Sequence, residues 1–211
     1  KIDDVYGFCL GRDTATGTNY AILNGKNGVM QQFRLVDTAG RFTTELVREY
    51  TFPSQTEGMV ADEARGWLYV GEEAAGIWKL PLVPKGNDAP RLVTAVADNP
   101  ALVADVEGLT LVETGPESGY LVASIQGNFT YAVFDRAGDN EYLGSFKIGP
   151  GDSCDMVEET DGLDGVSLAL PGFPGGALVV QDGFNFDGDT LRAQNFKYVD
   201  WGEVLRALNL E

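Results

Sequence analysis

The chain has 211 residues, and its 15 lysines and arginines stand against 32 aspartates and glutamates, a formal net charge of −17. Such a charge repels the phosphate backbone of nucleic acids, which excludes them as partners. The chain has no histidine, which excludes histidine zinc sites, histidine nucleophiles and Ser-His-Asp or Cys-His catalysis. Any hydrolysis must therefore use carboxylates, hydroxyls, amides and metal ions.

Short apolar runs separated by glycine-rich turns dominate the sequence, and long helical periodicity is nearly absent. Hydrophobic residues make up 44% of the chain beside 27 glycines and 9 prolines, which indicates a folded all-β protein rather than disorder. No apolar run reaches the roughly 18 residues of a transmembrane helix, so no membrane partner is expected. No signal peptide is visible, and the chain begins almost directly with a strand-like run, so we expect a segment upstream of Lys1.

A repeat of about 50 residues organises the chain. Its first recurring position is a dipeptide that ends in glycine, at Tyr6-Gly7, Glu57-Gly58, Glu107-Gly108 and Asp161-Gly162. A second recurring position lies near the end of the following strand, at Lys26, Glu73, Gln126 and Asp182. Repeats of this length with four strands are typical of β-propeller blades. The alternative is a β-sandwich in which the spacing is coincidental.

Four units follow one another along the chain. The first spans about 5–52, with strands at 8–10, from 20, at 30–35 and at 46–52. The second spans about 57–97, with strands at 59–61, from 67, at 77–82 and at 91–97. The third spans about 106–149, with strands at 109–111, from 120, at 131–134 and at 142–148. Each of these units therefore predicts one four-stranded blade.

The fourth unit, about 160–211, is shorter by one strand. Its strands are expected at 163–170, from 176 and at 196–201, and the apolar spacing of 201–210 predicts a short amphipathic helix. We therefore predict one domain, 1–211, with about four blades of a larger propeller, since such rings have about 4 to 8 blades.

The repeat also arranges acidic side chains in rows. Equivalent positions of successive blades face a shared space, and five of the recurring positions are acidic: Glu57, Glu73, Glu107, Asp161 and Asp182. Such a cluster is costly without a cation, and Ca²⁺ binds six to eight oxygens. Asp105 shares a face with Glu107, and Asp155 lies in the acidic stretch 152–164. We predict a metal cluster of the Ca²⁺ type; the alternative for a single Glu-Gly or Asp-Gly pair is a structural turn, and for the stretch 152–164 alone it is a solvated loop.

Several strings of the sequence resemble the β-propeller phytases. They are Ser54 to Met59, Trp67 to Glu73, Asp105 to Thr110, Gln126 to Asn128, Thr160 to Asp164, Gln181 to Gly183 and Gln194 to Lys197. The match runs in order over essentially the whole chain. That family is a six-bladed propeller that hydrolyses phosphomonoesters of phytate, inositol hexakisphosphate, with Ca²⁺. The resemblance implies that this chain corresponds to the C-terminal four blades, with an upstream segment or a second chain completing the propeller.

The resemblance also implies roles for individual residues. The implied metal ligands are Tyr6, Glu57, Glu73, Asp105, Glu107, Gln126, Asp155, Asp161 and Asp182. Glu57, Glu73 and Glu107 would be catalytic as ligands of the calcium cluster. Lys26 would bind phosphate beside Tyr6 and take part in catalysis. Asn27 stands where the family often has a glutamate, which implies a lost ligand or weaker metal binding at that point.

The implied activity is calcium-dependent release of phosphate from phytate or calcium phytate, by attack of a metal-activated water and without a phosphoenzyme. One alternative is a catalytically inactive fragment or binding module. Another is a calcium-dependent lactonase-type propeller hydrolase, whose weakly charged substrate would not need Lys26 beside the acids. We expect a secreted or periplasmic protein.

Overall fold

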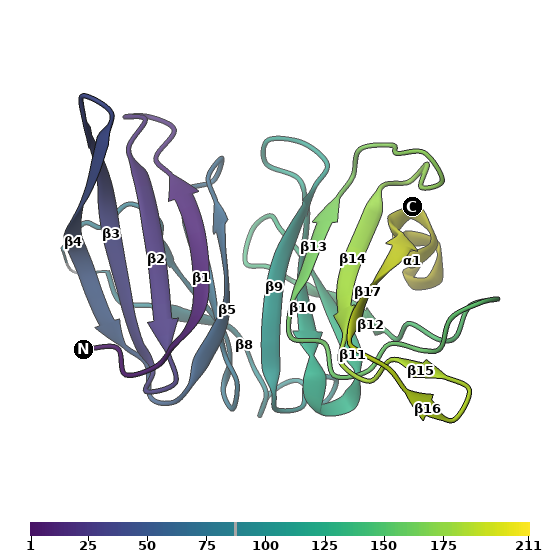
Figure 1. Ribbon diagram of the computed structural model, residues 1–211. Helices are drawn as coiled ribbons and strands as arrows, with labels where there is room; N and C mark the ends of the chain where they lie inside the picture. The colour runs from purple at the N-terminus through teal and green to yellow at the C-terminus, as the bar shows by residue number, and fades with distance from the viewer. Residues whose placement is uncertain (87) are drawn as a thin grey trace. The chain divides into compact units, whose positions relative to one another are not determined.

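A computed structural model describes residues 1–86 and 88–211 of the chain (Figure 1). Within those ranges the regular secondary structure is almost entirely β-strand, in successive antiparallel sheets, and the predicted all-β propeller fold is confirmed. The chain divides into two compact units, Lys1–Asn99 and Pro100–Glu211. The assignment of 1–211 to one domain stays a prediction.

The first unit holds two four-stranded sheets, in which each strand pairs with the next along the chain. The first sheet consists of β1 (Val5–Arg12), β2 (Asn19–Gly25), β3 (Val29–Thr38) and β4 (Arg41–Thr51). The second consists of β5 (Thr56–Asp62), β6 (Trp67–Glu72), β7 (Gly76–Pro81) and β8 (Arg91–Ala95). Short turns join several of the strands, such as the turn at Gly28 between β2 and β3, whose φ of +74° favours glycine.

The core of the first unit lies between its two sheets. Ile22 and Met30 of the first sheet pack with Leu68, Val70 and Leu80 of the second, and all five are fully buried or nearly so. Burying one such side chain contributes about 1.5–3 kcal/mol. This packing also brings β1 beside β5, the two strands that carry the first two glycine dipeptides.

The second unit begins with a four-stranded sheet of β9 (Val106–Glu113), β10 (Gly119–Ile125), β11 (Thr130–Asp135) and β12 (Tyr142–Phe146). The short 3₁₀ helix η1 (Gln126–Asn128) follows β10. A three-stranded sheet comes next, with β13 (Leu163–Val166), β14 (Ala177–Asp182) and β17 (Asn195–Asp200) in that order. The strand predicted at 163–170 ends at Val166, and the chain then turns at Pro171-Gly172, where Leu170 pairs with Phe173.

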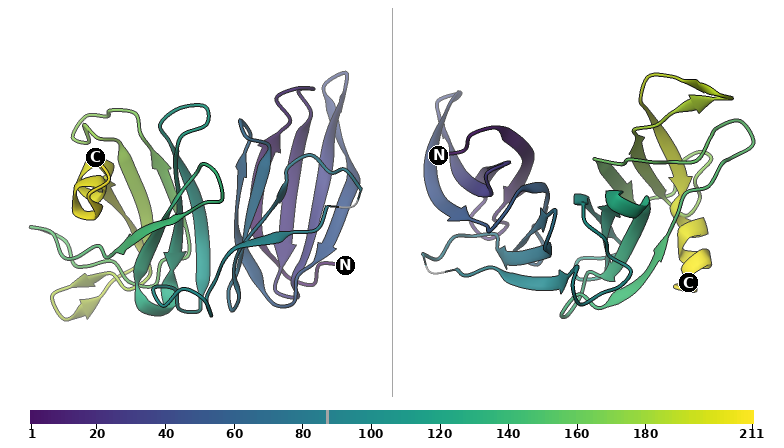
Figure 2. Two further views of the ribbon diagram at one scale, coloured as in Figure 1. Left: turned by 180° about the vertical axis from the view of Figure 1, so that it is seen from behind. Right: turned by 90° about the horizontal axis from the view of Figure 1, so that it is seen from below.

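A helix and a small hairpin complete the second unit. The helix α1 (Trp201–Leu208), yellow in Figure 2, packs against β12 and β17 and confirms the helix predicted at 201–210. Asp200 caps it by accepting a hydrogen bond of 2.7 Å from the Gly202 N–H, and Trp201 and Val204 are buried. The hairpin of β15 (Phe186–Asp187) and β16 (Thr190–Leu191) was not predicted, although Asp187-Gly188 is a typical turn signal. Among the described residues, no helix has the length and apolar character needed to cross a bilayer.

Candidate metal and phosphate site

A β-bulge interrupts β1 at the first glycine dipeptide. Val5 pairs with Gly25 and Phe8 with Leu23, so Tyr6 and Gly7 together oppose the single residue Asn24 of β2. A bulge of this kind turns the strand locally and re-aims its side chains, and bulges are frequent beside functional sites. Tyr6 therefore leaves the regular alternation of β1 at the end of the sheet where Lys26 follows β2.

The same irregularity recurs in the next two sheets. On β5 the pairing shifts between Thr56 and Met59, which places the bulge at Glu57-Gly58. On β9 it shifts between Val106 and Leu109, which places the bulge at Glu107-Gly108. Three of the four repeated dipeptides thus occupy equivalent places in their sheets, and in each the first residue is a predicted metal ligand.

The glycines of these dipeptides permit a close approach of the neighbouring sheet. A Cβ atom on Gly7 would lie 1.9 Å from the carbonyl oxygen of Glu57, which is in the next sheet of the first unit. In the second unit, a Cβ atom on Gly108 would lie 2.4 Å from the carbonyl oxygen of Asp161. The backbone of the acidic residue in one sheet therefore packs directly against the glycine of the preceding sheet. This contact holds each of the two acidic residues at the preceding bulge.

Glu57 and Glu73 lie close together in the first unit. One carboxylate oxygen of each lies within 4.8 Å of the other, and both residues are half-buried. Two negative charges at this separation repel by about 1 kcal/mol in water and about 3–4 kcal/mol at an effective dielectric constant of about 20. Gln55 donates a hydrogen bond to the Glu73 carboxylate and fixes its direction. Paired carboxylate oxygens of this kind fit a hard cation such as Ca²⁺.

Lys26 and Tyr6 lie together in the same unit. The Lys26 Nζ lies 4.5 Å from the centre of the Tyr6 ring and 3.9 Å from Asp4 Oδ2. The Lys26 side chain is 45% exposed, so its ammonium can meet an anion from solution. The neighbouring Asn27 is exposed, and its amide donates to the carbonyl of Lys1 at 3.0 Å.

Polar contacts also order the predicted ligands of the second unit. The Gln126 amide donates to Asp161 Oδ1 at 2.7 Å, and the Asp161 N–H donates to Gln181 Oε1 at 2.8 Å. The Gln126 N–H donates to the Asp105 carbonyl at 2.9 Å, which ties the half-buried Asp105 to the end of β10. Glu107 is buried within the β9 bulge. Because the Gln126 amide nitrogen faces Asp161, its oxygen is the atom available to a cation.

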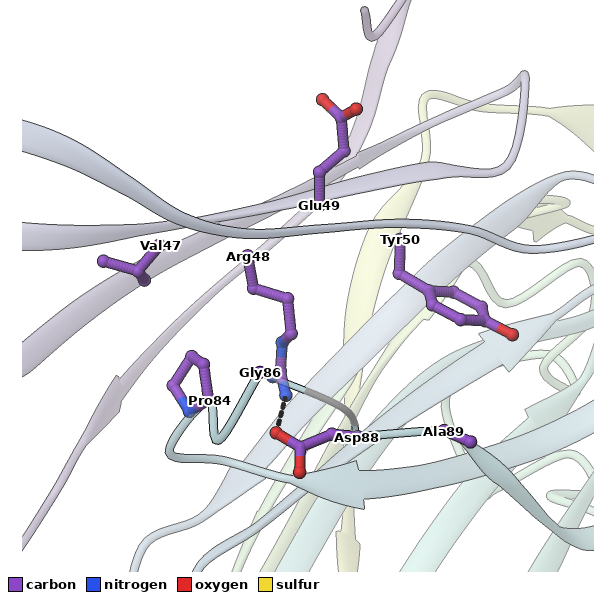
Figure 3. A pocket seen from close by; sticks show the side chains of 8 residues that line it. All are labelled: Val47, Arg48, Glu49, Tyr50, Pro84, Gly86, Asp88 and Ala89. Atoms are coloured by element: carbon purple, nitrogen blue, oxygen red, sulfur yellow. Dashed lines mark ion pairs between the residues drawn. The ribbon is translucent and has the colours of Figure 1, made fainter.

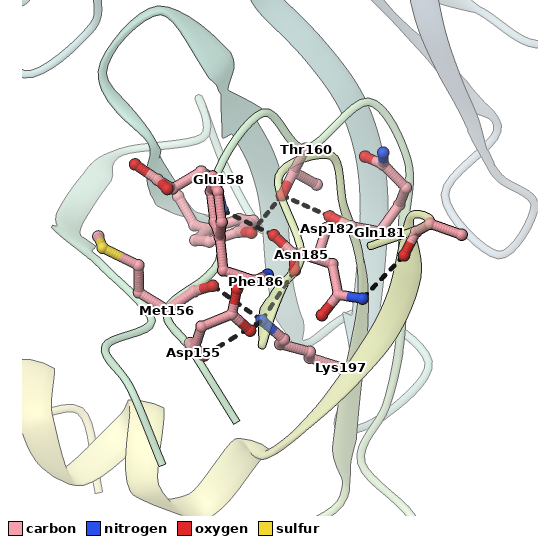
Figure 4. Close-up of polar contacts among 11 residues, drawn as sticks. Asp155, Met156, Glu158, Thr160, Gln181, Asp182, Asn185, Phe186 and Lys197 are labelled. Carbon is pink, nitrogen blue, oxygen red and sulfur yellow. Dashed lines mark hydrogen bonds and ion pairs between the residues drawn. The ribbon is translucent and has the colours of Figure 1, made fainter. Parts of the chain in front are cut away.

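Asp155 and Asp182 surround the ammonium of Lys197 in this structure (Figure 4). The Lys197 Nζ forms ion pairs with both carboxylates, at 2.8 Å for Asp182, and donates to the carbonyls of Asp155 and Met156 at 3.1 and 2.8 Å. Burial works against charge here, but the Lys197 hydrogen bond and the Phe186 N–H hold the pKa of Asp155 below its usual value. Burial lowers the pKa of Lys197, but the hydrogen bonds and charges of the two carboxylates outweigh burial, so this pKa is raised. The metal roles of Asp155 and Asp182 stay predictions, and a lysine supplies their counter-charge here.

A cavity of about 460 Å³ in the first unit involves none of the predicted site residues (Figure 3). It lies beside Arg48 of β4, which donates to the Pro81 carbonyl at 2.7 Å and lies 3.8 Å from Asp88 Oδ2. Burial lowers the pKa of Arg48 to about 10. Arg48 and Asp88 form a mostly buried ion pair, which links the segment after β7 to β4.

The sequence missed four polar residues that hold the predicted site residues: Asn24, Gln55, Ser124 and Lys197. Asn24 and Ser124 lie two residues before Lys26 and Gln126, so the repeat register could have identified them. Lys197 lies in one of the strings that resemble the phytases. Its role depends on pairing between β14 and β17, which the sequence alone does not show.

Comparison with known proteins shows what this chain is similar to. A sequence model of the Phytase family matches residues 1–211. The 3-phytase of Bacillus subtilis (strain 168) is 42% identical over 211 residues, which cover 99% of this chain and 55% of that protein. The chain thus spans about half the length of the curated relative it matches. The solved structure of U3-55K has a TM-score of 0.52 at 12% identity, covering 93% of this chain and 53% of that chain, and shows a shared fold alone.

Proposed function

Because the chain belongs to the phytase family, we propose that the protein of which it is part hydrolyses phosphomonoesters of phytate with the help of calcium. One observation in the structure supports this most directly: the carboxylates of Glu57 and Glu73 lie within 4.8 Å of each other in the unit that also holds Lys26 over Tyr6. A cation site and a phosphate-binding cation would thus come from the same pair of sheets.

Calcium is the cofactor that this donor set fits best. Glu57 and Glu73 offer hard carboxylate oxygens, and no histidine or paired cysteine ligands of zinc are available in the sequence. When bound, calcium would bring positive charge to a phosphate group and favour ionisation of a bound water. In the second unit the proposed ligands are Asp105, Glu107, Gln126, Asp155, Asp161 and Asp182, which supports several ions in all.

The other residues of the proposed site bind and orient the substrate. The exposed ammonium of Lys26 can pair with phosphate oxygens and offset the charge that develops on them during phosphoryl transfer. The ammonium lies over the Tyr6 ring, and this cation–π contact favours its position beside the β1 bulge. Glu57 and Glu73 in the first unit, and Glu107 in the second, would take part in catalysis as calcium ligands, and the proposal assigns no side chain the role of a phosphorylated nucleophile.

The proposal also covers the form of the substrate, the rest of the propeller and the location of the protein. Phytate is strongly anionic and the chain carries −17, so calcium or calcium phytate is needed to reverse the local repulsion. We include in the proposal an upstream segment or second chain that completes the propeller, and a secreted or periplasmic location, where free calcium is abundant enough to fill weak sites.

The test is release of inorganic phosphate from phytate in calcium and in excess chelator. Activity should require calcium, and Glu57→Gln should abolish it, since the substitution keeps the size of the side chain and removes the charge. Glu49→Gln is the matched control, because Glu49 is an acidic residue of the same unit that hydrogen-bonds Gln31 away from the bulges.

The possible outcomes separate the alternatives. Chelator-insensitive activity, or full activity of Glu57→Gln, would refute the proposed site. Saturable binding of phytate without phosphate release would instead indicate a binding module, and hydrolysis of lactones in place of phytate would indicate a lactonase.

A further inference from the structure

Asn24 is a fully buried asparagine that uses both ends of its amide at the bulges. Its Oδ1 accepts a hydrogen bond from the Gly7 N–H at 2.7 Å, and its Nδ2 donates to the Glu57 carbonyl at 2.9 Å. Asn24 is also the residue that the β1 bulge opposes. One side chain thus joins the backbone of Tyr6-Gly7 to the backbone of Glu57, across the boundary between two sheets.

The second unit repeats this arrangement with a different residue. Ser124 occupies the position in β10 that the β9 bulge opposes, and it is 1% exposed. Its hydroxyl donates at 2.7 Å to the carbonyl of Thr160, the residue directly before Asp161. In both units, the residue opposite the bulge of one sheet therefore binds the backbone at the acidic residue of the next.

We propose that Asn24 and Ser124 are positioning residues, which set the height and direction of Glu57 and Asp161 so that these carboxylates can bind calcium. The inference rests on the proposed function, since each residue is assigned to the support of a proposed calcium ligand of its own unit. The close packing at Gly7 and Gly108 already holds the acidic residues at the bulges. A directional hydrogen bond to the backbone also fixes their orientation, and groups that orient metal ligands typically change metal affinity by about 10–100-fold when lost.

The experiment compares Asn24→Ala with Gln32→Ala in calcium titrations by calorimetry. Gln32 is the matched control, because it is also a fully buried amide of the first sheet and donates to a backbone carbonyl of the second, that of Leu82 at 2.9 Å. Leu82 follows β7 at the end of the second sheet opposite to Glu72 and Glu73. Asn24→Ala loses two side-chain hydrogen bonds and Gln32→Ala loses one, but only Asn24→Ala releases Glu57.

We expect Asn24→Ala to weaken calcium binding by about 10-fold or more and Gln32→Ala to leave it within about 2-fold of the wild type. In a Glu57→Gln background, Asn24→Ala should weaken binding no further, because its effect passes through Glu57. Ser124→Ala removes a single hydroxyl and should likewise weaken binding. If Asn24→Ala lacks a cooperative melting transition, the calcium affinity of Ser124→Ala tests the positioning role instead.

Two failures are distinguishable. If the wild type shows no saturable calcium binding, the proposed calcium site is wrong. If the wild type binds calcium and Asn24→Ala and Ser124→Ala bind it as tightly as Gln32→Ala does, the calcium site stands and the positioning role is refuted.

Discussion

Replacing Lys197 with methionine would remove the cation from an enclosed polar cluster of the second unit. The Lys197 side chain is 8% exposed, and its ammonium contacts the carboxylates of Asp155 and Asp182 and two carbonyl oxygens. The substitution keeps most of the aliphatic side chain. It leaves the fully buried Asp182 and the 18% exposed Asp155 as two negative charges without their counter-charge.

Breaking a buried ion pair by removing one partner costs about 3–5 kcal/mol. Because Asp155 keeps some contact with solvent, we expect Lys197→Met to lower the free energy of unfolding by about 3 kcal/mol, near the lower end of that range. The assay is urea-induced unfolding at neutral pH in the presence of chelator. Arg192→Met is the control, since Arg192 pairs with Asp187 at 2.8 Å in the same unit but the two side chains are 56% and 73% exposed. An exposed pair is worth less than about 1 kcal/mol.

The difference between wild type and Lys197→Met should depend on pH in a defined direction. The folded-state pKa of Asp155 is lowered, so its contribution is complete above the ordinary value of 3.8 and is lost as the pH falls further. The folded-state pKa of Lys197 is raised, so its contribution is complete below the ordinary value of 10.5 and is lost at still higher pH. In the wild type the contributions of these two groups should therefore be constant from about pH 5 to 9.

Calcium should restore part of the stability of Lys197→Met, because the four oxygens around the ammonium are ligands that a hard cation accepts. A loss within about 1 kcal/mol of that caused by Arg192→Met would refute the structural role of Lys197.

Three further outcomes follow from the geometry. Gly7→Ala should destabilise the first unit by about 1–3 kcal/mol or more in chemical denaturation, since its Cβ would meet the Glu57 carbonyl at 1.9 Å; Gly162→Ala, whose Cβ would meet nothing within 4 Å, should cost far less. Equal losses in the two variants would contradict the close approach described at the bulges. At pH 8 an alkylating reagent should modify the exposed Cys154 and leave Cys9 intact, because burial raises the pKa of Cys9 to about 12. Alkylation of Cys9 in the native protein, detected by mass spectrometry, would contradict this. Asp200→Ala should cost about 1 kcal/mol by removing the cap of α1, and an unchanged melting temperature would count against that role.

The repeat made the fold predictable from the sequence. The glycine dipeptides and apolar runs placed four sheets and the C-terminal helix, because alternation of buried and exposed residues is a local property of each strand. The shorter β13 and the β15–β16 hairpin were harder, since the apolar Leu168 and Leu170 read as strand while the turn around Pro171-Gly172 ends the sheet.

The candidate site was predictable in its acidic residues and much less so in its supporting contacts. The register of the repeat identified Glu57, Glu107 and Asp161 as equivalent, and the structure places the first two at bulges of their sheets. The hydrogen bonds of Asn24 and Ser124 cross from one sheet to the next, so they depend on tertiary packing. The same is true of Lys197, which reaches Asp155 over a sequence separation that no local pattern reveals.

The central claim is that Glu57 and Glu73 hold a cation, and the melting temperature of Glu57→Gln in chelator and in calcium tests it most directly. Without metal, the neutral side chain relieves the repulsion between the two carboxylates, so the variant should melt at the same temperature as the wild type or higher. In calcium the wild type should gain stability by mass action and the variant should gain much less. A variant that melts below the wild type in chelator and gains as much from calcium would show that Glu57 is a structural residue and that the claim is wrong.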